Sequence, residues 1–126
     1  MSDLMPTFLL DSTVFDWAKL VPLPTKAGEC RNFFDAATRT LGRLECHATT
    51  LRGGERGHEV HQHADEELIL VKEGRLEVTT NDRTAFAEAG AIVFFASMDL
   101  HGMRNAGTDQ ATYYVLRIFP RDLPSG

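Results

Sequence analysis

The chain has 126 residues, of which 43% are hydrophobic and 25% are charged, as in an ordinary folded domain. This length and composition exclude two independent hydrophobic cores and a disordered chain. The 13 lysines and arginines against 18 aspartates and glutamates give a net charge of -5, and they form no basic run. Nucleic-acid binding is therefore not expected, because it usually relies on a basic patch.

Neither a membrane span nor a signal peptide is expected. The longest apolar run covers residues 91–96, whereas a spanning helix needs about 20 apolar residues. The first residues lack the basic and apolar regions of a secretion signal. Two cysteines, Cys30 and Cys46, do not make a disulfide framework. We expect reduced thiols in a cytoplasmic protein.

In chain order, the sequence begins with an N-terminal arm over residues 1–28, followed by one domain over residues 29–126. One short helix is expected at residues 13–20, capped by Asp11 or Ser12. Short β-rich segments, separated by Gly, Pro, Asn and Asp, then predict strands near residues 30–35, 43–51, 60–63, 67–72, 75–80, 84–88, 91–95, 101–105 and 112–119. Many short strands at this spacing are typical of an all-β sandwich or barrel.

One expected strand is apolar on both of its faces. In the segment 68–71, Leu68-Ile69-Leu70-Val71, one face can point into the barrel. The other face needs cover from a second sheet, from the arm or from another subunit. Residues 8–10 of the arm could form a strand that lies on, or exchanges with, a partner. We therefore expect a homodimer.

Two of the five histidines, His61 and His63, are one residue apart on an expected strand, so they project from the same face. Glu67 follows four residues after His63, and a polar turn would bring it onto the neighbouring strand beside them. Two imidazoles and one carboxylate can share a divalent cation. The alternative is a set of surface polar residues at a strand end, which this spacing disfavours.

The order of these residues resembles the two motifs of the cupin superfamily. The first motif corresponds to His61, His63, Glu67 and Gly74. The second runs from Gly90 through His101 to Asn105, and the 15 residues between Gly74 and Gly90 match the short spacer of microbial cupins. The resemblance covers about residues 43–119, and the whole chain is similar to small single-domain cupins of unassigned activity. It implies an all-β double-stranded β-helix of jelly-roll type with an N-terminal arm.

Three turn positions depart from these motifs. Ala96 and Met98 stand where the second motif has Pro and Gly, and Glu55 stands where the first has its leading Gly. These positions shape loops in the family and do not bind metal. The departures therefore affect the expected loop geometry more than the expected ligands.

The resemblance implies that the metal ligands are His61, His63, Glu67 and His101. Glu66 is a rival carboxylate, but Glu67 keeps both of the gaps that the first motif requires. Such a set leaves coordination positions open on one octahedral Fe, Mn, Ni or Co ion per chain, whereas Zn more often takes four ligands. The ion and the carboxylate sum to one positive charge, which favours a small anionic ligand, or a polyhydroxy one that binds through two oxygens.

Further residues are candidates for a substrate pocket around this metal site. The two arginines among them could pair with an anionic substrate, although a solvated strand face is the commoner role. The apolar ones could equally be ordinary core. Tyr114 and Arg117 have opposite parity on their strand, so both cannot face the interior without a bulge. His58, in the Gly-rich lead-in to the first motif, is a loop residue that could gate the pocket. The candidates are Ile92, Phe94, Met103, Arg104, Tyr114 and Arg117.

The function expected from this pattern is metal-dependent catalysis of oxygenase, isomerase or hydrolase type on a small anionic or polyhydroxy metabolite. The alternative is a non-catalytic cupin that binds a small ligand through its metal. A structural protein that keeps these residues without using a metal is a third possibility. The fold alone does not choose among them.

Overall fold

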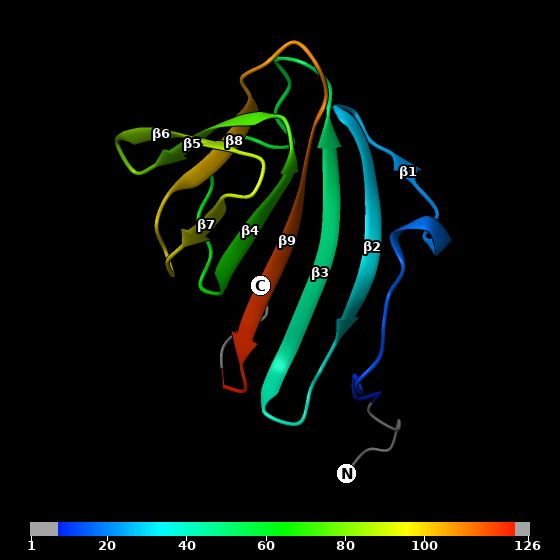
Figure 1. Ribbon diagram of the computed structural model, residues 1–126. Helices are drawn as coiled ribbons and strands as arrows, with labels where there is room; N and C mark the ends of the chain where they lie inside the picture. Colours follow the sequence, from blue (N-terminus) through cyan, green and yellow to red (C-terminus); the bar gives the residue numbers. More distant parts are fainter. Residues whose placement is uncertain (1–7, 123–126) are drawn as a thin grey trace.

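The computed structural model describes residues 8–122, which form two β-sheets (Figure 1). The larger sheet has the strand order β1-β2-β3-β9-β4-β7, and the smaller has the order β6-β5-β8. A single 3-10 turn, η1 (Trp17–Lys19), precedes them. The strands are β1 (Leu23–Pro24), β2 (Gly28–Ala36), β3 (Leu41–Leu51), β4 (Glu66–Glu73), β5 (Arg75–Thr80), β6 (Arg83–Glu88), β7 (Ile92–Phe95), β8 (His101–Asn105) and β9 (Ala111–Pro120).

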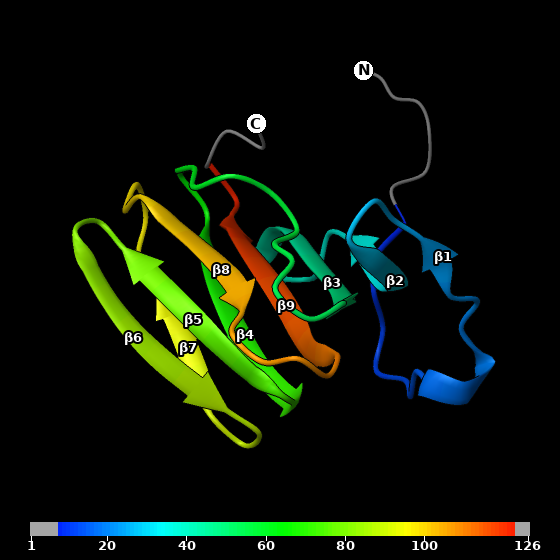
Figure 2. The same ribbon diagram turned by 90° about the horizontal axis from the view of Figure 1, so that it is seen from above.

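The smaller sheet covers only part of the larger one. Figure 2 shows β5, β6 and β8 facing the β4, β7 and β9 part of the large sheet, while β1 and β2 extend beyond this cover. The two inner faces enclose a core to which strands contribute alternate residues, such as Ile69 and Val71 of β4 and Leu76 and Val78 of β5. The expected all-β jelly-roll architecture is confirmed.

Two expected elements are wrong in detail. Residues 60–63 form no strand: they are a loop that makes one isolated antiparallel bridge, between His61 and His101. The helix expected at 13–20 is reduced to the three-residue turn η1. Thr13, Val14 and Phe15 have weak helix propensity, and no side chain caps the turn, so a longer helix is not stabilised.

The segment before β2 is only partly an independent arm. Strand β1 lies within residues 1–28, but it pairs with β2 and so belongs to the large sheet. Leu9 makes one parallel bridge with Ala37, and its neighbour Phe8 stays 74% exposed. Residues 1–7 of the expected arm lie outside the described residues.

The outer face of the large sheet is covered unevenly. Trp17 packs against Tyr114 of β9 at 5.7 Å between ring centroids, so the N-terminal segment covers this part of the sheet. Towards the β7 edge, Ile92 and Phe94 are 68% and 53% exposed. The homodimer stays a prediction. Within residues 8–122, no helix has the length and apolarity to cross a membrane.

Candidate functional site

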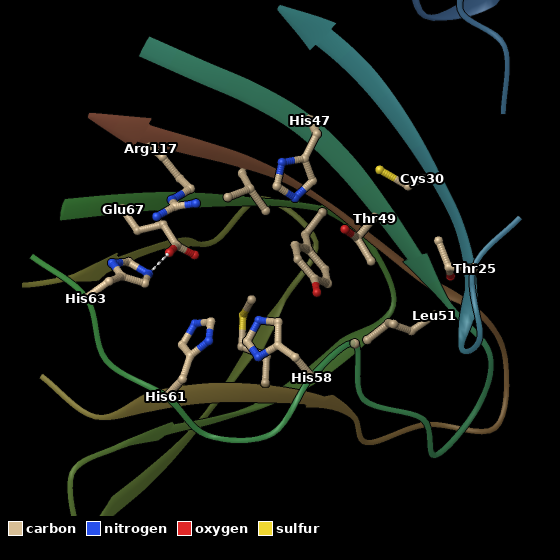
Figure 3. Close-up of a pocket in the computed structure, with 14 residues that line it drawn as sticks. Thr25, Cys30, His47, Thr49, Leu51, His58, His61, His63, Glu67 and Arg117 are labelled. Carbon is tan, nitrogen blue, oxygen red and sulfur yellow. Dashed lines mark ion pairs between the residues drawn. The ribbon is translucent and has the colours of Figure 1, made fainter. Parts of the chain in front are cut away.

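Four side chains that could bind a metal ion converge between the two sheets, and Figure 3 shows three of them, His61, His63 and Glu67. They are His61 and His63 from the loop before β4, Glu67 on β4, and His101 at the start of β8. Each offers one ligand atom, and these four atoms all lie within 4.8 Å of one another. Glu67 and His101 are buried, at 6% and 2% exposure. The structure therefore brings together the four residues that the two motifs single out.

Backbone hydrogen bonds hold the loop in an extended path beside β8. The amide of His61 donates to the carbonyl of His101 at 3.0 Å, and the amide of His101 donates to the carbonyl of His61 at 2.8 Å. The amide of Met98 donates to the carbonyl of His63 at 2.9 Å. The two histidines therefore reach the same site from a locally extended loop, without the continuous strand expected for them.

The carboxylate of the cluster is Glu67 and not its neighbour Glu66. Side chains alternate along β4, so Glu67 faces the interior whereas Glu66 is exposed. The Glu66 carboxylate accepts a hydrogen bond from the amide of Ser97 at 3.4 Å. Strand periodicity thus separates the two rivals.

Hydrogen bonds to backbone carbonyls orient two of the imidazoles. Nδ1 of His63 donates to the Asp65 carbonyl at 3.0 Å, and Nδ1 of His101 donates to the Asp99 carbonyl at 2.9 Å. With the proton on Nδ1, each Nε2 presents a lone pair to the cluster. Second bonds of this kind orient the histidines of many metal sites.

The inward-facing atoms fit a cation. Nε2 of His61 and Nε2 of His101 are buried without a hydrogen-bond partner. Nε2 of His63 lies 2.8 Å from Oε1 of Glu67, and that of His101 lies 3.5 Å from the same oxygen. A lone pair and a carboxylate oxygen repel each other unless a proton or a cation lies between them. A divalent ion would satisfy all four groups at once.

The pKa values of His61 and Glu67 favour the forms that bind metal, whereas that of His101 does not. Burial, followed by the neighbouring imidazoles, lowers the pKa of His61 to about 4. Burial alone would raise the pKa of Glu67, but the neighbouring imidazoles of His101 and His63 hold that pKa below its usual range. Burial would lower the pKa of His101, but the neighbouring Glu67 carboxylate raises it. Neutral imidazole and ionised carboxylate are the ligand forms that a metal requires.

A buried ion pair lies directly behind the cluster. Asp65 is 1% exposed, and Arg117 of β9 donates two hydrogen bonds to its carboxylate, at 2.7 Å and 2.9 Å. Burial would raise the pKa of Asp65, but the hydrogen bond and charge of Arg117 lower it. Asp65 also supplies the carbonyl that orients His63. Arg117 therefore supports the site through Asp65.

A cavity of about 260 Å³ opens from the cluster toward β2 and β3. Of the six pocket candidates, Met103 and Arg117 line it. Most of the remaining wall comes from residues that the sequence analysis did not select for the pocket. The alternation along β3, which points His47, Thr49 and Leu51 to one face, could have identified these three. The lining residues are Thr25, Cys30, His47, Thr49, Leu51, Gly57, His58, His61, His63, Glu67, Met103, Tyr113, Val115 and Arg117.

Four pocket candidates lie outside this cavity. Ile92 and Phe94 are on the outward face of β7, because Val93 and Phe95 take the inward face. The expectation that these two residues line the pocket is therefore wrong. The reason is the two-residue period of a strand, which sends neighbours to opposite faces.

Arg104 and Tyr114 also lie outside the cavity, contrary to expectation, for the same reason. Arg104 donates from Nε to Oε1 of Glu77 on the neighbouring strand at 2.9 Å. Tyr114 packs against Trp17 and Phe33 outside the sheet. Of the two residues with opposite parity on β9, it is Arg117 that faces the interior.

His58 lies beside the cluster at the wall of the cavity. Its ring stacks on that of His61, with 4.0 Å between centroids and 17° between planes. Its Nδ1 lies 2.9 Å from the carbonyl of Glu59. The loop therefore contributes a third histidine to the cavity surface, next to the two motif histidines.

The sequence profile of the cupin domain matches residues 48–117 of the chain. This stretch includes all four residues of the cluster. No curated protein matches the sequence.

Solved structures show the same fold at low sequence identity. A predicted oxalate decarboxylase from Thermotoga maritima superposes with a TM-score of 0.69 at 16% identity, covering 85% of this chain and 99% of that one. The polyketide cyclase RemF from Streptomyces resistomycificus gives 0.69 at 17% identity, with coverages of 91% and 82%. An RmlC-like cupin from Shewanella frigidimarina gives 0.66 at 17% identity, with coverages of 88% and 95%. At these identities the likeness concerns the fold alone.

Proposed function

Because this chain belongs to the cupin domain family, we propose that it is a metal-dependent enzyme acting on a small anionic or polyhydroxy metabolite. His61, His63, Glu67 and His101 would hold one divalent transition metal ion. The observation that carries the proposal is the set of four converging ligand atoms, two of which are buried nitrogens without a partner. Buried polar atoms normally have partners, and a bound ion would be the partner of both nitrogens.

The donor set narrows the choice of metal. Three imidazole nitrogens and one carboxylate oxygen suit Fe, Mn, Ni or Co with coordination positions left for substrate, and they also suit Zn. A bound ion of this kind would act as a Lewis acid that polarises a substrate oxygen. The identity of the reaction, whether oxygenase, isomerase or hydrolase, depends on the substrate that occupies the cavity.

The residues of the chain supply the charge and the shape of the site. Glu67 contributes one negative charge, so a divalent ion would leave a net charge of about +1, which attracts a single anionic group. Leu51, Met103 and Val115 give the cavity an apolar part of its wall. Arg117 donates from Nε and Nη2 to Asp65, so it orients the site through that residue.

Metal analysis of the purified protein tests the proposal. Tag-free protein, prepared without chelator and without nickel resin, is expected to contain about one Fe, Mn, Ni or Co ion per chain. The variant His63→Ala should lose the metal, whereas His47→Ala, which changes a cavity histidine outside the cluster, should keep it. Absence of metal, with no uptake on adding any of these ions, would contradict the proposal.

Turnover distinguishes an enzyme from a binding protein. Metal-loaded protein is screened for oxygen consumption and for conversion of hydroxy acids and keto acids, with the His63→Ala variant as the control. Conversion that disappears in the variant is the expected result. Saturable binding without any product would instead favour the non-catalytic alternative.

A further inference from the structure

His47 gives the cavity a second polar position, outside the metal cluster. Nδ1 of His47 lies 2.7 Å from Oε2 of Glu45, two residues earlier on β3. These side chains are 25% and 13% exposed. We call these two residues the distal pair. They take no part in the metal cluster.

The register of the large sheet fixes where the distal pair lies. In one row across β3, β9 and β4, Glu45 is paired with Arg117, and Arg117 is paired with Glu67. His47 is two residues further along β3, on the same face as Glu45 and opposite Val115 of β9. Two strand spacings, about 10 Å in all, therefore separate the distal pair from the strand that carries Glu67. Figure 3 shows the ring of His47 directed into the cavity from the side opposite His61.

The chemistry of the distal pair favours a hydrogen-bond donor. An ionised carboxylate can only accept, so Nδ1 of His47 donates to Glu45 and Nε2 is left for a ligand, as an acceptor when the imidazole is neutral. A hydroxyl group of a ligand could donate to it. A ligand carboxylate at the same place would be repelled by the negative charge of Glu45. The permanent cation among the lining residues is Arg117, which is already paired with Asp65.

The surface between the two ends is largely apolar. Tyr113 and Val115 of β9 line the cavity, together with Leu51 at the end of β3. The volume of about 260 Å³ accommodates one small ring or a short chain. A ligand that fits the whole cavity would thus have one chelating end, an apolar middle and a neutral hydroxyl end.

We propose that the distal pair recognises a neutral hydroxyl group on a substrate whose other end chelates the metal. This inference rests on the proposed metal site and narrows its substrate class. The substrate would be a small singly chelating molecule with a hydroxyl tail. A long dicarboxylate with a second acid group at the distal end would be excluded.

This inference is tested with three catechols. They differ only in the substituent at position 4 of the ring, para to one hydroxyl. The probes are 4-(hydroxymethyl)catechol, 4-methylcatechol and 3,4-dihydroxybenzoate, which carry a neutral donor, an apolar group and an anion. Protein loaded with Fe(III) is titrated with each probe, and the iron–catecholate absorption band reports binding. Wild-type protein should bind the hydroxymethyl probe about tenfold more tightly than the methyl probe, and the benzoate most weakly.

Two variants assign this selectivity to the distal pair. His47→Phe keeps an aromatic ring but removes the acceptor, so the tenfold preference should fall to within about twofold. Glu45→Gln removes the negative charge, so binding of the benzoate should improve several-fold. Cys46→Ala is the matched control, because Cys46 lies between them on the strand and points to the opposite face.

The outcomes separate this inference from the proposed function. If no protein takes up iron or forms the absorption band, the proposed metal site is wrong. If wild-type protein forms the band but binds the three probes equally, the metal site stands and the role of the distal pair is overturned. A preference that persists in His47→Phe would overturn it as well.

Discussion

The guanidinium of Arg117 binds the buried carboxylate of Asp65 through two hydrogen bonds, from Nε to Oδ2 at 2.7 Å and from Nη2 to Oδ1 at 2.9 Å. Such two-point pairs fix both position and angle. Asp65 in turn accepts a hydrogen bond from Nδ1 of His63 through its backbone carbonyl. The pair therefore connects the central strand β9 with the loop that carries two histidines of the cluster.

Breaking this pair should destabilise the fold. Arg117→Met would leave the Asp65 carboxylate, 1% exposed, without its cation, and we expect the free energy of unfolding to fall by about 3 kcal/mol. Urea unfolding measures the change. The control is Arg104→Met. The guanidinium of Arg104 pairs with Glu77, and these two side chains are 35% and 28% exposed, so loss of this pair should lower the free energy of unfolding by less than about 1 kcal/mol. Equal losses in both variants would contradict this role of Asp65.

Adjacent glutamates offer a matched test of the metal site. Glu67→Gln removes the buried carboxylate of the cluster, and the affinity for Co or Ni should fall by about 100-fold. Glu66→Gln changes the exposed neighbour and should leave the affinity within about twofold. Competition with a chelating dye measures both constants. A comparable loss in both variants would show that overall charge, and not the Glu67 ligand, determines the affinity.

Two glycines with positive φ differ in the space around them. At Gly74, φ is +87° and an added Cβ would lie 2.6 Å from Cβ of Ala111; at Gly90, φ is +94° and nothing lies within 4 Å. Gly74→Ala should therefore cost about 3 kcal/mol, from backbone strain and overlap together, and Gly90→Ala about 1 kcal/mol from strain alone. Thermal unfolding of the two variants compares them. Equal costs would show that the backbone strain dominates at both turns.

Cys46 should make stability fall at alkaline pH. Burial, with a smaller contribution from Glu45, raises the pKa of its thiol to about 11. The unfolded chain loses this proton at lower pH than the folded chain does, so the folded state binds more protons between about pH 9 and 11. The contribution is complete below pH 9 and disappears as the pH rises through 11. Urea unfolding at several pH values should show a steeper decline for wild-type protein than for Cys46→Ala.

The fold and the metal cluster were readable from the sequence because they depend on local pattern. Short β-rich segments between regular turn residues indicated a β-barrel, and the spacing of His61, His63 and Glu67 indicated a metal site. The resemblance to the cupin motifs added His101, and the gaps of the first motif favoured Glu67 over Glu66. The loop at residues 60–63 was the exception, since tertiary bridging to β8, and not local propensity, gives it its extended form.

The cavity beyond the cluster was decided by the tertiary structure. Which strand lies beside which is a long-range choice, and the order β3-β9-β4 places His47 and Glu45 across from Glu67. The same strand order allows Arg117 to bind Asp65, which is fifty-two positions away in the chain. Sequence spacing determined which residues could bind a metal. The pairing of distant strands determined which residues face that metal, because burial and register depend on the whole sheet.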